Sequence, residues 1–590
     1  MPRRRLRIPA AVAAALIAIG APAVAVAEAG APAAKTVNCN TGDLQSALNA
    51  APDGGTVTVK GTCDGSFDIN KNLTLEGAPT ATIDGEGTYT ALSVADGLHV
   101  TLAHLTIQDG GGSEVAAGGL DISDKAHLKL TYVNVTNNQS YGNGAGVLAG
   151  DDSVVTASHG SFSHNHAALV DNTPVDLAGA AIYSTGTVTL DHTTVDDNSL
   201  SAQSSSESSA SGGAVYDEGK LTIRNSSFGH NLAGSQDAFG GSIYANGDAV
   251  TISSTTFAGD KALGEDTDNS SEKSSGGSLF LSADRNTLNR VRVTGSYAIV
   301  NSPNGGSAAG GALRSIRPIT ITDSTFADNG VEATEASGTD GVTADGGALD
   351  LEDESKAEVS RSTISGNTTT ASAADATALA RGGGIFASGN DEAATLTDST
   401  IADNSSTATR PKGSPGSATA LATGGGVQDE SHHLTFRYDT VAGNTAKGAT
   451  TSQGGGLDIT TGLALPKPTT VGSIWAANTA HTGPQCDGGF HSSGWNLFSG
   501  LRDCATATKH SDKAHGRARL GTLAANGGPT KTMALGRGSQ ALDRVPRKTC
   551  RAVVTKDQRG VPRPQGAATN PSHRRCDEGA YEKKVTRHRR

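Results

Sequence analysis

One short pattern recurs along most of the sequence, and this repeat limits the folds open to the chain. A pair of small residues is followed by an aliphatic residue, as in SGGAVY, FGGSIY, AGGALR, DGGALD and RGGGIF. Successive aliphatic anchors are 27 to 42 residues apart. The anchors are Leu120, Val147, Ile182, Val215, Ile243, Leu279, Leu313, Leu349, Ile385, Val427 and Leu457. Such a period indicates a solenoid of stacked units rather than several globular domains.

Each anchor is followed by a short run of alternating apolar and polar residues, such as LTIRNSSF or VTISSTTF. This period of two is typical of strands with one buried face, and no helical period of comparable length occurs. Most runs close on an asparagine, while Asp260 and Ser296 close the other two; the asparagines are Asn138, Asn165, Asn198, Asn231, Asn329, Asn367, Asn404, Asn444 and Asn478. Stacking in register would place each amide above the next, as a structural asparagine ladder. The repeat therefore predicts a parallel β-helix.

Composition agrees with a narrow aliphatic core. The 590 residues include 2 Trp, 9 Tyr and 11 Phe, too few for several conventional cores, and 76 Gly. Glycine pairs permit tight corners and close stacking of backbones. Stacked Val, Leu, Ile and Ala need few aromatic side chains.

Repeat length varies on one side only. From anchor to closing residue the distance is 16 to 21 residues, but from closing residue to the next anchor it is 9 to 23. The extra residues are small, polar and acidic, as in GEDTDNSSEKSSG, which predicts loops. We therefore expect every insertion to leave the same side of the repeat and to form a variable contact surface.

Both ends of an open β-helix need a cap. Residues 43–48 predict a short amphipathic helix with Asp43 as its N-cap, followed by the strand GGTVTV. Residues 481–590 lose the repeat and predict a C-terminal cap region with a basic tail. We expect the β-helix itself, of about fourteen coils, to span residues 36–480.

The N-terminus is typical of a secretory signal peptide. Four arginines precede an apolar stretch of about ten residues, too short to span a bilayer, and Ala25-Val26-Ala27 forms a cleavage site. Residues 1–27 are therefore predicted to be removed on export, and no later segment has transmembrane length. Six cysteines suit an oxidising compartment.

The cysteines lie near the two ends of the chain: Cys39, Cys63, Cys486, Cys504, Cys550 and Cys576. Pairing of nearest neighbours is the simplest of the about 15 possible connectivities. A zinc site would require paired short spacings such as C-x-x-C, which do not occur.

Charge divides the chain into an acidic body and a basic end. Residues 28–500 carry 22 Lys+Arg and 52 Asp+Glu, whereas residues 501–590 carry 21 Lys+Arg and 7 Asp+Glu. The body would repel nucleic acid, so we expect no nucleic-acid partner. The basic end is either a solvated tail or an electrostatic attachment to an acidic cell-wall polymer.

Several motifs resemble known families. Gly212-Gly213-Ala214-Val215 with Phe228 to Asn231 resembles the repeat of polymorphic outer-membrane proteins and related right-handed parallel β-helices, and residues 41–77 are similar to the N-terminal cap and first coils of pectate-lyase-like proteins. SIWAANTA, DQRGVPRPQG and CDEGAYE resemble the end region of choice-of-anchor Q surface proteins. The resemblance implies an all-β, right-handed parallel β-helix with an N-terminal capping helix and an irregular, disulfide-containing C-terminal cap. It also implies an exported, surface-associated rod.

Candidate catalytic and metal sites are sparse. Asp151-Asp152 and His159-Gly160 lie within one coil, whereas a galacturonan hydrolase of this fold would place its motifs on successive coils and add an Arg-x-Lys motif. Asp196-Asp197 suit a turn before Asn198. His164 and His166 share a strand face and can hold a metal, although they also suit a solvated turn. We assign no catalytic, cofactor or metal residue.

The favoured hypothesis is a non-enzymatic, secreted or cell-surface rod of adhesin-like character that binds an extracellular ligand, such as a glycan or a cell-wall polymer. No cofactor is expected. The alternative is a polysaccharide lyase or glycoside hydrolase of the pectate-lyase-like fold, an analogy of fold alone.

Overall fold

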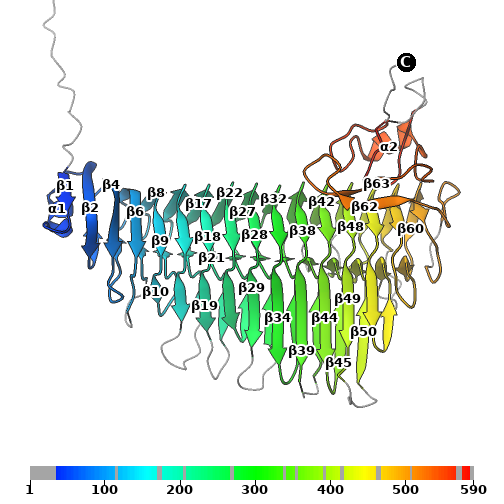
Figure 1. Cartoon of the computed structure of the whole chain (residues 1–590), viewed down its shortest axis with the longest axis horizontal. Helices are drawn as coiled ribbons and strands as arrows, with labels where there is room; N and C mark the ends of the chain where they lie inside the picture. Colours follow the sequence, from blue (N-terminus) through cyan, green and yellow to red (C-terminus); the bar gives the residue numbers. More distant parts are fainter. Residues whose placement is uncertain are drawn as a thin grey trace, which may run out of the picture.

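The computed structural model describes residues 35–112, 117–168, 176–202, 208–265, 272–336, 340–352, 356–389, 394–411, 418–459, 467–504, 508–565 and 574–584. The predicted signal peptide, residues 1–27, lies outside these ranges. In the described residues the chain is a rod of stacked parallel strands, coloured blue to yellow from one end to the other in Figure 1. The predicted all-β parallel β-helix is confirmed.

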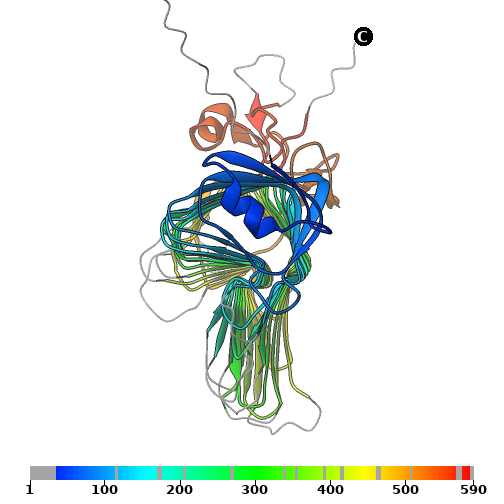
Figure 2. The same ribbon diagram turned by 90° about the vertical axis from the view of Figure 1, so that its left-hand side faces the viewer.

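Each coil crosses a closed ring, and the coils from β10 (Gln139–Ser140) to β55 (Thr451–Gln453) also leave the ring as a fin (Figure 2). Sheet A forms one side of the ring as two adjacent columns of strands, which run from β8 (His127–Thr131) to β60 (His491–Gly494) and from β9 (Asn134–Thr136) to β61 (Leu497–Phe498). The first coils cross both columns with single long strands: β2 (Gly55–Asp64), β4 (Leu73–Asp84) and β6 (His99–Gln108). Sheet A therefore bends once its strands shorten.

Sheet B closes the ring opposite the bend, with one short strand in each coil. Its strands are β3 (Phe67–Ile69), β5 (Leu92–Val94), β7 (Leu120–Ile122), β11 (Val147–Ala149), β16 (Ile182–Ser184), β21 (Val215–Asp217), β26 (Ile243–Ala245), β31 (Leu279–Leu281), β36 (Leu313–Ser315), β41 (Leu349–Leu351), β46 (Ile385–Ala387), β51 (Val427–Asp429), β56 (Leu457–Ile459) and β59 (Cys486–Asp487). The predicted anchors from Leu120 to Leu457 are the first residues of these strands, and their side chains are buried in the core of the ring.

Where the structure describes them, the segments predicted to be loops are strands of the fin, so the expectation was wrong for these parts. Sheet C leaves the ring and sheet D returns to it. Sheet C includes β10 (Gln139–Ser140), β19 (Ser199–Ala202), β29 (Lys261–Glu265), β34 (Tyr297–Ser302), β39 (Gly330–Glu335), β44 (Thr368–Ala373), β49 (Ser405–Thr409) and β54 (Thr445–Gly448). Sheet D comprises β15 (Leu177–Ala178), β20 (Ser209–Ser211), β25 (Asp237–Phe239), β30 (Glu272–Ser275), β35 (Gly306–Ala309), β40 (Val342–Asp345), β45 (Thr377–Arg381), β50 (Thr419–Thr423) and β55 (Thr451–Gln453).

Small side chains explain the fin. Ala333, Ala344, Ala371 and Ala380 are fully or almost fully buried between sheets C and D, within a core that is mostly alanine. Alternate residues of the same strands face solvent and are polar. The sequence of these segments therefore has the composition of polar loops. Two sheets that face each other through alanine need no large apolar residue.

Asparagines link the coils at the turn from sheet A to sheet C. The Asn165 side-chain nitrogen donates to Asn198 Oδ1 at 2.9 Å and to the carbonyl of Val135 at 3.1 Å. Equivalent bonds join Asn329, Asn367, Asn404, Asn444 and Asn478. All of these amides are buried. The ladder satisfies buried backbone groups that the turn leaves without strand partners.

Asp260 takes an asparagine's place in this ladder, and its surroundings differ accordingly. Ser278 donates its hydroxyl to the second carboxylate oxygen of Asp260 at 2.9 Å, and Ser242 also donates to this carboxylate. Burial nevertheless raises the pKa of Asp260 to about 6. At the level of Asn367, the corresponding small residues are Ala348 and Gly384, which have no hydroxyl. Two serine hydroxyls therefore accompany the aspartate in the ladder, whereas none lies beside Asn367.

Glycines make the corner between sheets D and B. Gly382 has φ +61°, in the left-handed region that favours glycine. A Cβ on the next residue, Gly383, would lie 2.4 Å from the carbonyl oxygen of Gly425 on the following coil. The glycine pair therefore permits both the turn and the close stacking of coils.

The N-terminal end of the core is covered by helix α1 (Leu44–Ala50), visible across the open ring in Figure 2. The Asp43 carboxylate caps this helix by accepting hydrogen bonds from the backbone nitrogens of Gln45 and Ser46. Leu44 and Leu48 are buried against the first coils. The expected capping helix is confirmed.

The C-terminal region both ends the core and returns along the rod. Sheets A and B continue beyond residue 480, to Phe498 and Asp487. Residues from about Leu520 then lie on the outer face of sheet A, on the side of the ring opposite the fin (Figures 1 and 2). This part contains β62 (Leu520–Ala524), β63 (Thr532–Leu535), β64 (Val545–Pro546), α2 (Arg547–Val553) and β65 (Arg575–Cys576).

Three disulfide bonds join nearest neighbours in the sequence: Cys39–Cys63, Cys486–Cys504 and Cys550–Cys576. The first ties the segment before α1 to β2, the second crosses the last coil, and the third holds α2 to β65. Within the described ranges, no helix is long and apolar enough to cross a membrane.

Asp217, the last residue of β21, makes stability depend on pH. The side chain is 1% exposed, one oxygen accepts from the backbone of Gly219, and Oδ2 has no partner in the described structure. Burial raises the pKa of Asp217 from 3.8 to about 8. The folded protein therefore keeps a proton that the unfolded chain releases, so stability falls as pH rises from about 4 to about 8 and then levels off.

Asp217→Asn is expected to raise the melting temperature at pH 8, by an amount equivalent to about 2 kcal/mol, because it removes a buried charge. The difference should shrink toward pH 4. Asp68→Asn, at an exposed position of β3, serves as the control. Thermal unfolding followed by circular dichroism would contradict this prediction if the gain at Asp217 were the same at both pH values.

Candidate functional site

Sheet B presents one outward side chain in each coil, directly after the anchor. From β16 to β59 these residues form a single row, because the strands pair in register. The row comprises Tyr183, Tyr216, Tyr244, Phe280, Arg314, Asp350, Phe386, Gln428, Asp458 and Asp487. The last residue of each sheet D strand lies beside it across the glycine turn. We call this line of contact between the two sheets the B–D corner.

The first part of the row is aromatic. Tyr183, Tyr216, Tyr244 and Phe280 stack with ring centroids 4.9 to 5.2 Å apart and planes within 9° of parallel. Phe239 of β25 meets the edges of the last two rings, at 6.5 and 5.5 Å. Because the ring faces cover one another, the half-buried tyrosines present edges and hydroxyls to solvent.

These phenolic hydroxyls form a spaced row of hydrogen-bonding groups. Tyr216 donates to Glu218 at 2.8 Å. Burial, followed by the hydrogen bond to Glu218, raises the pKa of Tyr216 well above 10, so this hydroxyl keeps its proton at neutral pH.

The middle part of the row is charged and internally paired. Arg314 Nε lies 3.3 Å from Asp350 Oδ2, and Arg314 also pairs with Glu352. Burial, and then the charge of Glu352, raise the pKa of Asp350 well above its usual range. This carboxyl is fully buried and has no hydrogen-bond partner in the described structure besides its ion-pair contact with Arg314.

Arg381 of β45 lies next along the corner and is held from both sides. It binds Asp345 through two hydrogen bonds of 2.6 and 2.7 Å, and Glu430 through one of 2.7 Å. Its guanidinium lies 4.4 Å from the centre of the Phe386 ring. Burial raises the pKa of Asp345 to about 6 despite this arginine.

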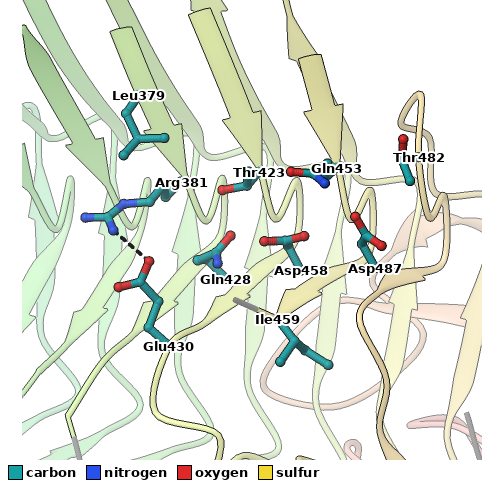
Figure 3. A pocket seen from close by; sticks show the side chains of 10 residues that line it. All are labelled: Leu379, Arg381, Thr423, Gln428, Glu430, Gln453, Asp458, Ile459, Thr482 and Asp487. Atoms are coloured by element: carbon teal, nitrogen blue, oxygen red, sulfur yellow. Dashed lines mark hydrogen bonds and ion pairs between the residues drawn. The ribbon is translucent and has the colours of Figure 1, made fainter. Parts of the chain in front are cut away.

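Beyond Arg381 the corner opens into a hollow of about 400 Å³ (Figure 3). Its lining combines carboxylates, amides and hydroxyls with two aliphatic side chains: Leu379, Arg381, Thr423, Gln428, Glu430, Gln453, Asp458, Ile459, Thr482 and Asp487. This volume falls within the range of small-molecule sites. Eight of these ten residues lie on strands of sheets B and D, while Glu430 and Thr482 lie outside the strands.

Two features of the hollow indicate that it is not a filled structural corner. The Thr423 hydroxyl is buried, the residue being 9% exposed, and it has no hydrogen-bond partner within the described residues. Asp458 hydrogen-bonds Gln428, but burial, followed by the charges of Asp487 and Glu430, raises its pKa to about 7. A ligand group that binds here would satisfy the hydroxyl and meet crowded carboxylates.

The residues singled out in the sequence lie elsewhere. Asp151 accepts from the Thr185 hydroxyl, at the start of the coil whose far turn carries His159. His159 stacks on His192 at 5.0 Å, on the outside of sheet A. Neither residue lines the hollow.

One cluster outside the B–D corner has metal-ligand chemistry. Ligand atoms of Asp196, Asp197 and His230 lie within 4.8 Å of one another, and His164 is 3.7 Å from Asp197. Their side chains are solvent-exposed, and His230 already pairs with Asp196 at 3.2 Å. His166 points away from this cluster, to the Ser199 hydroxyl.

Comparison with known proteins gives little beyond this geometry. No protein-family model matches the chain, and no curated protein matches it. Among solved structures, a mannuronic acid specific polysaccharide family 6 lyase from human gut microbiota is 9% identical, with a TM-score of 0.34 over 74% of this chain and 91% of that one. The PL6 family alginate lyase AlyGC is 11% identical, with a TM-score of 0.23 over 82% and 79% of the two chains. At these values the similarity carries no statement about activity.

The hollow escaped sequence reasoning, although the signal was present. Aligning the repeats on their anchors places every outward residue of sheet B in one column, the position directly after the anchor. This column changes from aromatic to charged along the chain. The sheet D residues are not visible in this way, because insertions of variable length shift their register.

Proposed function

We propose that the protein is an exported, surface-associated or secreted rod that binds an extended glycan without cleaving it, along the B–D corner. The hollow beside Thr423 carries this proposal, since a polar pocket with an unpartnered buried hydroxyl is suited to sugar hydroxyl groups. The tyrosine row lies farther along the same corner, beyond Arg381 and Arg314, so the corner offers polar contacts along the rod axis to a linear polymer. Among the described residues, the corner at the base of the fin contains this hollow, so the corner is the proposed contact surface.

The proposal predicts that Tyr216→Ala weakens binding by about tenfold or more, because the substitution removes a hydroxyl and the packing of two neighbouring rings. Tyr216→Phe, which keeps the ring, should lose only about threefold. Tyr132→Ala is the control, since Tyr132 is 50% exposed on sheet A, away from the corner. Isothermal titration with neutral, amino and uronic acid oligosaccharides measures these effects.

No binding to any of these glycans, or equal losses for Tyr132→Ala and Tyr216→Ala, would refute the proposed function. The same incubations reveal catalysis, because a hydrolase produces new reducing ends and a lyase produces unsaturated ends.

Glycoside hydrolysis is the second candidate, on one observation. Asp458 and Asp487 face outward from adjacent strands of sheet B, and burial raises the pKa of Asp458 to about 7, so that it is protonated below neutral pH, as a general acid requires. If the unmodified protein releases reducing ends from a glycan and Asp458→Asn does not, the function is hydrolysis and not binding alone.

A further inference from the structure

We infer that the hollow selects a glycan with free amino groups, and that Asp458 and Asp487 bind the ammonium group of one amino-sugar residue. This inference rests on the proposed function, because it names the class of glycan that the B–D corner would bind. It depends on how charges are paired around the hollow, on an unpartnered hydroxyl in it, and on its size.

The two arginines of the corner are already neutralised. Arg381 binds carboxylates on both sides, Asp345 and Glu430, and Arg314 binds Asp350 and Glu352. A uronic acid carboxylate that enters the hollow would therefore meet arginines whose charges are already paired with carboxylates of the protein. It would also meet Asp458, Asp487 and Glu430. Like charges at close range disfavour such a ligand.

Asp458 and Asp487, by contrast, lack a cationic partner. They pair directly in register on β56 and β59, and both line the hollow. Among the described residues, no lysine, arginine or histidine forms an ion pair with either of them. Asp487 accepts a hydrogen bond from the backbone nitrogen of Gly488, and Asp458 hydrogen-bonds Gln428. Burial raises the pKa of Asp458 to about 7, and an ammonium group placed between the two side chains would lower that pKa again. It would favour the ionised form of Asp458 and donate hydrogen bonds to both carboxylates.

The rest of the lining suits the remainder of a sugar ring. Thr423 offers its unpartnered hydroxyl, while Gln453 and Thr482 offer further polar groups at the rim. Leu379 and Ile459 supply the apolar contact that the carbon-bound face of a sugar requires. A volume of about 400 Å³ accommodates a sugar ring of the chain with its attached groups. A bare metal ion would leave the hydroxyl and the aliphatic contacts unused.

The test compares hexamers of glucosamine, N-acetylglucosamine and galacturonate by isothermal titration near pH 6, using the full mature chain. The first two ligands differ in the amino group. We expect the glucosamine hexamer to bind at least about tenfold more tightly than the N-acetylated hexamer, and the galacturonate hexamer to bind weakest.

Asp487→Asn and Asp458→Asn should each weaken binding of the glucosamine hexamer by about 10- to 100-fold while changing binding of the N-acetylated hexamer by less than about threefold. Asp121→Asn is the matched control, because Asp121 is the outward residue of β7, in register with the row but before its first residue and far from the hollow. Thr423→Val should weaken both hexamers alike. Unchanged melting temperatures show that the variants fold.

Equal affinity for the two hexamers, or preference for galacturonate, overturns the inference while leaving glycan binding intact. So does a calcium titration that shows a saturable site abolished by Asp487→Asn without any preference for the amino sugar. Failure of all three hexamers to bind refutes the proposed function itself.

Discussion

Asn367→Ala is expected to destabilise the protein by about 4 kcal/mol, one of the two largest effects that we predict. The Asn367 side chain is fully buried, accepts from the backbone and side-chain nitrogens of Asn329 at 3.0 Å each, and donates to Asn404 and to the carbonyl of Phe326. Alanine would leave the buried backbone N–H of Asn329 without this acceptor, and would remove one hydrogen bond each from the Asn329 side chain and the Phe326 carbonyl. Chemical denaturation followed by circular dichroism measures the loss.

The control is Asn301→Ala, at an exposed position of β34, which should change stability by less than about 0.5 kcal/mol. Asn367→Asp is more informative. Asp260 is accommodated in the ladder with hydroxyls from Ser242 and Ser278, but position 367 has none, so the aspartate should destabilise more at pH 8 than at pH 5. If Asn367→Ala reduced the free energy of unfolding no more than Asn301→Ala does, the hydrogen bonds of the ladder would contribute little to stability.

Arg563→Met is expected to release the C-terminal region from sheet A at a cost of about 3–5 kcal/mol. Arg563 is 3% exposed, and its guanidinium lies 4.8 Å from the centre of the Tyr438 ring and pairs with Asp398 at 2.9 Å and Glu582 at 3.3 Å. Methionine fills much of the volume but leaves two buried carboxylates without a cation. Hydrogen exchange of residues 545–565 and 574–584 should rise, while the β-helix keeps its circular dichroism.

The loss should be smaller near pH 5 than near pH 8. Burial raises the pKa values of Asp398 and Glu582 to about 7, although the arginine lowers them. Removing the arginine raises both pKa values further, so at pH 5 the two carboxyls bind protons and are buried without charge. Arg551→Met, at an exposed position of α2, is the control. Simultaneous unfolding of the whole rod would mean that the C-terminal region is an integral part of the β-helix and not a segment docked on it.

Much of the fold was predictable because each coil repeats the contacts of the previous one. Val188, Leu221 and Val250 stand in the same column of sheet A, so a repeat in sequence is also a repeat in contacts. The glycine pairs and the asparagines recur for the same reason. Only the polar insertions were misread, since alternating alanines such as Ala371 and Ala373 resemble loop composition yet form a dry interface between two sheets.

The candidate site was less predictable. Its sheet B residues stand one place after each anchor, but Arg381 and Thr423 come from sheet D, and their position follows from where each insertion ends. The chemistry of Asp458 arises from burial and from neighbours on other strands. Neither property is visible in an isolated repeat.

The sequence by itself determined the parallel β-helix, its N-terminal capping helix and the asparagine column, because these depend on interactions between neighbouring coils that the repeat makes explicit. Tertiary structure alone decided the fin, the hollow at the B–D corner and the docking of the C-terminal region. That docking joins residues as distant as Ser362 and Gln558, which hydrogen-bond across 196 positions of the chain. Contacts of that kind follow no period, so they depend on which surfaces the folded coils bring together.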